Sequence, residues 1–237
     1  MAISDDVVNQ YKLKDEDLIN NSANRVPVCL VVDSSASMGV GNRIQSVNNG
    51  IRNFLREGRN NDYAADSIDL CIVAFNGDNG AVIQPFSNIC SVSFKNINAA
   101  GGSPLGSTVL TALEAIKNRL EDYETHGISS FKPWLIIMSD GEASPWDNRH
   151  FNRALLQLKE LDQQRKIKIA CINMNENENN DLNKLSLGKG VGKIDSFHME
   201  QFFSMLSKSA ANLSVSTVGE DDESVIFQTF DDLEAPV

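Results

Sequence analysis

Short, mostly apolar runs alternate with helical patterns along this chain, and that alternation restricts its fold more than any other feature. Strands that alternate with amphipathic helices are typical of an α/β fold, in which helices cover both faces of a mainly parallel sheet. The apolar character of the runs fits strands that are buried on both sides. The expected strands are Val28–Val32, Asp69–Phe75, Ala81–Phe86, Trp134–Met138, Ile167–Asn173 and Ile194–His198.

The helical patterns lie between these runs. Apolar residues such as Ile44, Val47 and Ile51 recur at helical spacing and predict a helix from about residue 42 to residue 57. Similar stripes predict further helices around Leu105–Leu120, Phe151–Leu161, Asp181–Leu187 and Phe202–Leu213.

Only the short turn at residues 76–80 (Asn-Gly-Asp-Asn-Gly) separates the second and third expected strands. A turn of this length cannot hold a helical crossover, so the two strands must form an antiparallel hairpin. We therefore expect a doubly wound, mainly parallel, six-stranded sheet in the order 3-2-1-4-5-6, with one antiparallel edge strand.

The chain of 237 residues is long enough for one large domain with a full core. We expect a lead-in at residues 1–25, the domain at residues 26–217, and an acidic, flexible tail at residues 218–237. The net charge of −11 argues against a nucleic-acid partner, because phosphate binding relies on a basic surface. No Lys or Arg follows Lys208, so much of the negative charge belongs to the tail.

Several features favour a cytoplasmic protein with no membrane association. The first residues lack the basic and apolar regions of a secretion signal. No apolar run approaches the roughly 20 residues that are needed to cross a bilayer. The cysteines show no CxxC pairing and are expected to be free thiols, as in a reducing compartment. These cysteines are Cys29, Cys71, Cys90 and Cys171.

Oxygen-bearing side chains follow two of the expected strands. Asp33, Ser35 and Ser37 come directly after the first strand, and Asp140 follows the fourth. In the order 3-2-1-4-5-6, these two strands are neighbours at the point where the strand order reverses. Open α/β sheets bind ligands at this point, beyond the carboxyl ends of the strands. We therefore expect Asp33 and Asp140 to face one crevice.

A glycine-rich loop, Gly101–Gly106, precedes the next helix and can bring Ser103 to the same edge of the sheet. The assembled side chains all offer oxygen atoms, which suit Mg²⁺, Mn²⁺ or Ca²⁺ better than zinc. The sequence therefore predicts a divalent-metal site whose ligands are Asp33, Ser35, Ser37, Ser103 and Asp140.

These residues resemble the metal-ion-dependent adhesion site of von Willebrand factor A-type (VWA) domains. The family motif is Asp-x-Ser-x-Ser after the first strand, a Thr in a later loop, and an Asp after the fourth strand. Asp33, Ser35, Ser37 and Asp140 match this motif, whereas Ser103 stands where the family usually has Thr. Serine keeps the hydroxyl group but lacks the methyl group that restricts the threonine rotamer. The resemblance covers roughly residues 26–213.

Within that family, several stretches are similar to bacterial TerY-type proteins of tellurium-resistance gene clusters. These stretches are residues 25–28, 46–51, 101–106, 132–134 and 140–142. The resemblance implies a cytoplasmic, non-catalytic, metal-dependent module that binds an acidic residue of a partner protein. It also implies a bacterial stress-response context that includes a protein kinase and a phosphatase.

Two other functions are open to such a chain. A Mg²⁺-dependent phosphatase of the haloacid-dehalogenase type could use Asp33 as its nucleophile. Such enzymes usually carry a second Asp two residues later, where this chain has Ser35, and no phosphate-binding glycine loop is present. The second alternative is a scaffold that binds its partner without metal.

Simpler structural roles are the alternatives for individual residues. The Asp33 motif could cap the helix that follows it, and Ser103 could cap the helix after Pro104. We expect Ser34 to assist the site without binding the metal. Glu142 and Asp147 are expected on the solvated rim, and the histidines share no metal-ligand spacing. These histidines are His126, His150 and His198.

Overall fold

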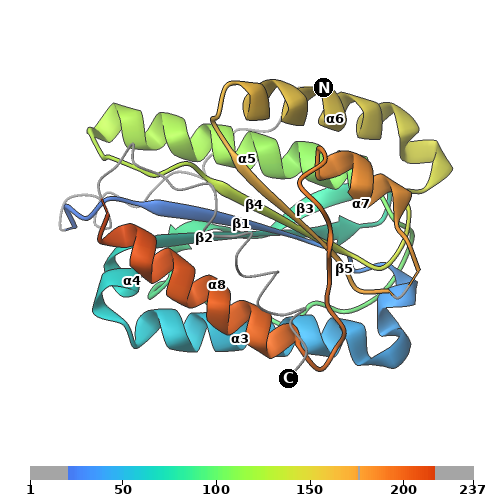
Figure 1. Ribbon diagram of the computed structural model, residues 1–237, viewed down its shortest axis with the longest axis horizontal. Helices are drawn as coiled ribbons and strands as arrows, with labels where there is room; N and C mark the ends of the chain where they lie inside the picture. Colours follow the sequence, from blue (N-terminus) through green and yellow to red (C-terminus); the bar gives the residue numbers. More distant parts are fainter. Residues whose placement is uncertain (1–20, 176, 217–237) are drawn as a thin grey trace.

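A single mixed sheet forms the centre of the protein in the computed structural model, which describes residues 21–175 and 177–216 (Figure 1). Its strand order is β3-β2-β1-β4-β5-β6, which confirms the predicted order. The strands are β1 (Val26–Val32), β2 (Ile68–Asn76), β3 (Asn79–Asn88), β4 (Trp134–Ser139), β5 (Lys168–Asn173) and β6 (Gly192–Lys193).

The β2–β3 hairpin is the antiparallel pair, and the other neighbouring strands are parallel. Strand β3 lies at one edge of the sheet, so the predicted antiparallel edge strand is confirmed. Strand β1 lies between β2 and β4, and all seven of its residues are buried. The carboxyl ends of β1 and β4 therefore meet at the middle of the sheet, where the strand order reverses.

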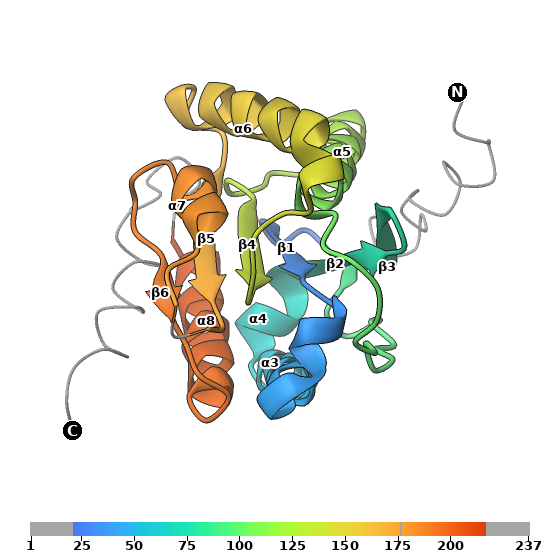
Figure 2. The same cartoon turned by 90° about the vertical axis from the view of Figure 1, so that its right-hand side faces the viewer.

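Helices cover both faces of the sheet (Figure 2). Helices α3, α4 and α8 lie against one face, and α5, α6 and α7 lie against the other. Two short 3₁₀ helices, η1 and η2, follow the carboxyl ends of β1 and β4. The helices are η1 (Ala36–Asn42), α3 (Arg43–Arg59), α4 (Asp62–Ser67), α5 (Leu105–His126), η2 (Pro145–Asp147), α6 (Asn148–Gln163), α7 (Asn180–Leu185) and α8 (Met199–Ser214).

The core consists of two apolar clusters, one on each face of the sheet. Alternate residues of β1 point into opposite clusters: Leu30 packs with α3 and α8, whereas Val31 packs with α5 and α6. This double burial explains why the strand is apolar at every position. Cys29, Cys71 and Cys171 are buried among these residues, and all four cysteines are free, as predicted.

Two expectations about secondary structure were wrong. The stretch Ile194–His198 is not a strand, because the Asp195 carboxylate accepts hydrogen bonds from the backbone of Phe197 and His198 and forms a turn there. The last strand is the shorter β6, which lies just before it. Helix α4 was not expected; it begins where the Asn61 side chain accepts a hydrogen bond from Ala64 N.

The expected lead-in falls mostly outside the described residues, and the expected tail lies entirely outside them. Within the described part of the lead-in, Arg25 forms a β-bridge with Ser130. Between residues 21 and 216, Glu176 aside, no helix combines the length and the apolar character that crossing a membrane requires.

Candidate metal centre

One continuous chain of hydrogen bonds links the Asp33 motif to Asp140. The Asp33 carboxylate accepts a bond from Ser35 N at 2.8 Å. The hydroxyl oxygens of Ser35 and Ser37 lie 2.9 Å apart, and Ser37 Oγ donates to Asp140 Oδ1 at 2.8 Å. The structure thus brings together four of the five predicted ligands.

The pairing of β1 with β4 explains this proximity. Val32 lies opposite Met138 in the parallel register, and Asp33 N donates to Met138 O at 2.9 Å. Both carboxylates are buried, with residue exposures of 0% for Asp33 and 4% for Asp140. Two acidic groups are therefore held next to each other away from water, an arrangement that requires nearby positive charge or strong hydrogen bonding.

The environment of Asp33 disfavours its charged form. Burial raises the pKa of the Asp33 carboxyl above its usual value, and the nearby Asp140 charge adds to this effect. Hydrogen bonds from Ser139 and Ser35 act in the opposite direction and lower the pKa in part. The Ser139 hydroxyl, which donates to Asp33 Oδ2 at 2.6 Å, was not recognised from the sequence.

Ser103 lies in a loop that two backbone hydrogen bonds fasten to the Asp33 motif. Ala36 N donates to Gly101 O at 3.1 Å, and Ala100 N donates to Ser34 O at 2.7 Å. The Ser103 hydroxyl is buried and has no hydrogen-bond partner. It therefore does not cap α5, and its oxygen is the one atom of the predicted set that is left without a protein partner.

The cap of α5 is instead provided by Asp147, which was expected on the solvated rim. This residue is buried, and its carboxylate accepts hydrogen bonds from Gly106 N at 2.5 Å and from Ser107 N. Burial raises the pKa of the Asp147 carboxyl, although these bonds and His150 partly offset the effect. A distant acid thus fixes the start of the helix and the loop before it.

A cation that the sequence analysis missed lies at the same place. Arg43, the first residue of α3, forms an ion pair with Asp140, with Nη1 2.7 Å from Oδ2. Its Nη1 also lies 3.4 Å from Ser37 O, within hydrogen-bonding range. The residue is separated from Asp140 by 97 positions, so no local pattern could reveal the contact.

A family model for the von Willebrand factor type A domain matches residues 28–213. The chain belongs to this family. No curated protein sequence shows significant similarity to this VWA domain.

Solved structures share its fold at low sequence identity. The pilus adhesin SpaC from Lactobacillus rhamnosus GG is 13% identical, with a TM-score of 0.60 over 81% of this chain and 31% of that chain. The von Willebrand factor domain of the type V pili tip protein Mfa5 from Porphyromonas gingivalis is 11% identical, with a TM-score of 0.59. That match covers 85% of this chain and 99% of that one.

The manganese-loaded TRAP protein of Plasmodium vivax is 19% identical, with a TM-score of 0.51 over 75% of this VWA domain and 71% of that chain. The chain spans only about a third of SpaC and about half of a mussel byssus protein, proximal thread matrix protein 1. These similarities show the fold.

The residues present fit a divalent cation of the hard type. Two carboxylates and three hydroxyls provide oxygen donors, and the unpaired Ser103 hydroxyl is available to a ligand. In the described part of the chain, no three residues among His, Cys, Asp and Glu gather into a metal-binding group. Any metal at this edge therefore depends on the serine hydroxyls as well as on the carboxylates.

Other candidate residues have structural roles. The Ser34 hydroxyl donates to Phe75 O at 3.1 Å, so it fastens the motif to β2. Glu142 is exposed, as expected. The three histidines each bond to a residue three or four positions away in their own segment.

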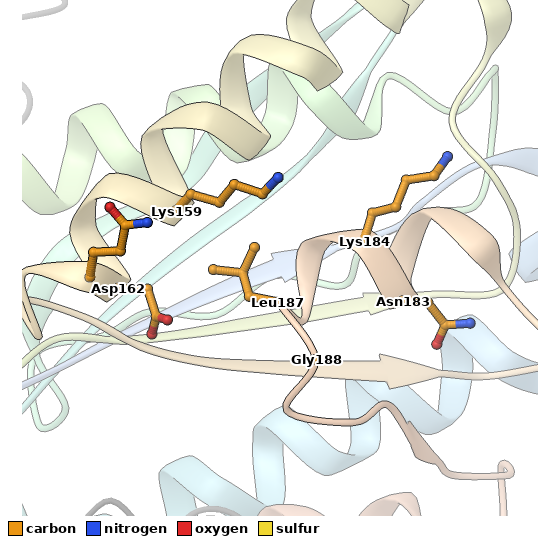
Figure 3. A pocket seen from close by; sticks show the side chains of 7 residues that line it. Lys159, Asp162, Asn183, Lys184, Leu187 and Gly188 are labelled. Carbon is orange, nitrogen blue, oxygen red and sulfur yellow. The ribbon is translucent and has the colours of Figure 1, made fainter.

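A separate pocket of about 550 Å³ lies between α6 and α7 (Figure 3). Lys159 and Asp162 of α6 and Asn183 and Lys184 of α7 line it. None of the predicted metal ligands lines this pocket, so it is separate from the candidate metal centre.

Proposed function

We propose that this VWA domain is a non-catalytic module for divalent-metal-dependent protein–protein interaction. The proposed ligand is an acidic residue of the partner, bound through a metal held by Asp33, Ser35, Ser37, Ser103 and Asp140. The observation that carries the proposal is the hydrogen-bonded chain from Asp33 to Asp140, in which both carboxylates are buried. A bound Mg²⁺, Mn²⁺ or Ca²⁺ would supply the positive charge that an outside carboxylate recognises.

The surface around this site supports a protein partner. Val40 of η1 and Trp146 of η2 are large apolar residues with exposures of 63% and 51%. Trp146 lies against Gly102, which precedes Ser103 in the loop. Phe197 is 80% exposed, and its neighbour Ser196 donates a hydrogen bond to Gly41 O. Exposed aromatic residues such as Trp146 and Phe197 are of the type that is enriched in protein–protein interfaces.

The environment of Asp33 supports a non-catalytic role. One carboxylate oxygen accepts from Ser35 N, and the other accepts from Ser139 Oγ. A nucleophilic carboxylate must present an oxygen to the substrate, and position 35 lacks the second acid that such phosphatases use. The missing acid at position 35 makes a phosphatase role a poorer fit for Asp33 than a role in holding a cation.

The proposed setting is a bacterial stress-response system in the cytoplasm, with a TerY-like role beside a kinase and a phosphatase. This part of the proposal rests on the similarity of residues 101–106 and 140–142 to TerY-type sequences. An extracellular adhesive role, such as the name of the pilus adhesin SpaC indicates for that protein, is the alternative setting.

Thermal unfolding with and without metal tests the site. We expect MnCl₂ or MgCl₂ to raise the melting temperature, because a ligand that binds only the folded state stabilises it, by about 2.7 kcal/mol at a hundredfold excess over Kd. Asp33→Ala should abolish the rise, whereas Asp78→Ala, in the exposed β2–β3 turn, should retain it. A wild-type protein that shows no rise with Mg²⁺, Mn²⁺ or Ca²⁺ would argue for the metal-independent scaffold.

Capture from a bacterial lysate with and without chelator tests the partner surface. We expect proteins that are retained in Mg²⁺ to be released by chelator and to be missing with Asp33→Ala. Trp146→Ala should weaken their retention. Leu156→Ala should not, because Leu156 is an exposed apolar residue of α6 and does not belong to the loops of the site. Turnover of a phosphoester that is lost with Asp33→Asn would overturn the non-catalytic proposal.

A further inference from the structure

Arg43 connects α3 to the candidate metal centre through its side chain. Its guanidinium group lies 2.7 Å from Asp140 Oδ2, and only 1% of the Asp140 side chain is exposed. The Arg43 side chain is 22% exposed, so the ion pair lies at the edge of the site and not in bulk solvent. Asp140 therefore has a full positive charge beside it within the protein.

The position of Arg43 in its helix is unfavourable without this partner. Helix N-termini carry a partial positive charge, which favours acidic residues and disfavours basic ones in the first turn. The first turn of α3 contains no acidic residue, and its first residue is Arg43. Gly41 and Asn42, with φ of 62° and 61°, are both in the left-handed region just before it. The ion pair with Asp140 is the interaction that offsets this unfavourable placement.

We propose that Arg43 is the built-in counter-cation of the site and sets the affinity of the site for metal. The inference rests on the proposed function. With two buried carboxylates, the site carries a charge of −2 when both are ionised, and the guanidinium group neutralises one of them. A divalent cation that uses Asp140 must bind beside a positive charge and must compete with it for the same carboxylate.

This competition lowers the affinity for metal and keeps the metal-free site folded. Removing the charge of Arg43 should therefore have two opposite effects. The metal-free protein should lose stability, because Asp140 is left buried without a counter-cation. The affinity of the variant for metal should rise on the order of tenfold or more, because a unit charge within a few ångströms of a divalent cation is only partly screened where the carboxylates are buried.

Titration calorimetry of the full chain with MnCl₂ alone tests the proposal. We expect Arg43→Gln to bind Mn²⁺ more tightly than the wild type, on the order of tenfold or more. Arg43→Lys keeps the charge and should stay close to the wild type. Arg52→Gln is the matched control on the same helix, because Arg52 is exposed and hydrogen-bonds to Asn49 and Asn96 instead. Melting temperatures of the metal-free proteins report whether each variant folds.

The outcomes separate this inference from the proposed function. Mn²⁺ binding with the same affinity in wild type and Arg43→Gln would overturn the role of Arg43 and leave the metal site intact. Binding only in Arg43→Gln would support the role of Arg43 and contradict metal-dependent function in the natural protein. Absence of binding in both would overturn both proposals. If Arg43→Gln fails to fold, Arg43→Met provides the uncharged variant, and it is compared with the wild type and Arg43→Lys. Equal affinities for Mn²⁺ in the charged and uncharged proteins would overturn the inference.

Discussion

Ser37 Oγ donates a hydrogen bond to Asp140 Oδ1 across 2.8 Å, although 103 positions separate the two residues in the chain. The bond joins the loop after β1 to the loop after β4. It forms because these strands are parallel neighbours at the centre of the sheet. Three small polar residues in a loop are common and do not by themselves indicate a binding site. Their contact with Asp140 makes these residues part of a larger polar cluster.

Ser103 should affect metal binding and not stability. Its hydroxyl is buried without a hydrogen-bond partner, so Ser103→Ala should leave the stability of the metal-free protein unchanged or slightly raise it. The same substitution should weaken Mn²⁺ binding, because one oxygen donor is lost. Calorimetric titration and urea unfolding of the same variant measure the two effects.

Ser103→Thr is the matched control for this prediction. Threonine keeps the hydroxyl and restricts its rotamer, so we expect metal binding at least as tight as in the wild type. A loss of stability in metal-free Ser103→Ala with no change in Mn²⁺ affinity would assign Ser103 a purely structural role.

Replacing Asp147 should destabilise the fold through the start of α5. In Asp147→Ala, Gly106 N and Ser107 N lose their acceptor in a buried place, which costs about 1–3 kcal/mol. Asp147→Asn keeps an acceptor oxygen and should lose less. The free energy of unfolding in urea measures both, and equal losses in the two variants would contradict the capping role.

Gly106 should not tolerate a side chain, because α5 and α6 approach each other closely there. A Cβ at this position would lie 2.1 Å from Phe151 N and 2.3 Å from its Cα, and backbone atoms cannot move aside cheaply. We expect Gly106→Ala to cost about 3 kcal/mol of stability. Gly39→Ala is the control, since its Cβ would meet only Ala99 Cβ at an ordinary 3.6 Å. Equal melting temperatures for the two variants would refute this close contact.

Tyr123 should make the protein sensitive to alkaline pH. Its hydroxyl donates to the buried Asp69 carboxylate, which also pairs with Arg119 at 2.6 Å. Burial, and then the Asp69 charge, raise the pKa of the Tyr123 hydroxyl well above 10.0. Above that ordinary value the unfolded chain loses this proton while the folded chain keeps it. The stabilising effect of Tyr123 is therefore complete below pH 10 and declines as the pH rises.

Urea unfolding between pH 9 and pH 11 checks this effect. We expect the pH slope of the unfolding free energy above pH 10 to be smaller in Tyr123→Phe, by up to about 1.4 kcal/mol per pH unit. A residual slope should remain, because burial also raises the pKa of the Cys29 and Cys171 thiols. An unchanged slope in Tyr123→Phe would contradict the prediction.

Much of the fold could be predicted because its signals are local. The apolar runs placed five of the six strands close to their observed positions, and the short turn at residues 76–80 revealed the antiparallel pair. The strand order then brought Asp33 and Asp140 together. Strand β6 was misplaced because it has only two residues, Gly192 and Lys193, whereas the stretch Ile194–His198, where the strand was expected, forms a turn.

The missed parts of the site depend on contacts between distant residues. Arg43 lies at the start of a helix where its charge looks unfavourable, and only the position of Asp140 explains it. The sequence around Asp147 indicates a surface acid, but in the structure its carboxylate accepts a hydrogen bond from the start of α5. In both cases a charged side chain is matched to a group more than 40 positions away on the chain, and composition or spacing carries no such information.

The pairing of β1 with β4 also has a kinetic consequence. Residues 33 and 140 can meet only after more than a hundred residues of intervening chain have been closed into place, which is a slow type of contact to form. Any ligand that needs both carboxylates can recognise only a chain whose central strands have already assembled. Such a ligand should therefore lengthen the lifetime of the folded protein far more than it shortens the time needed to fold.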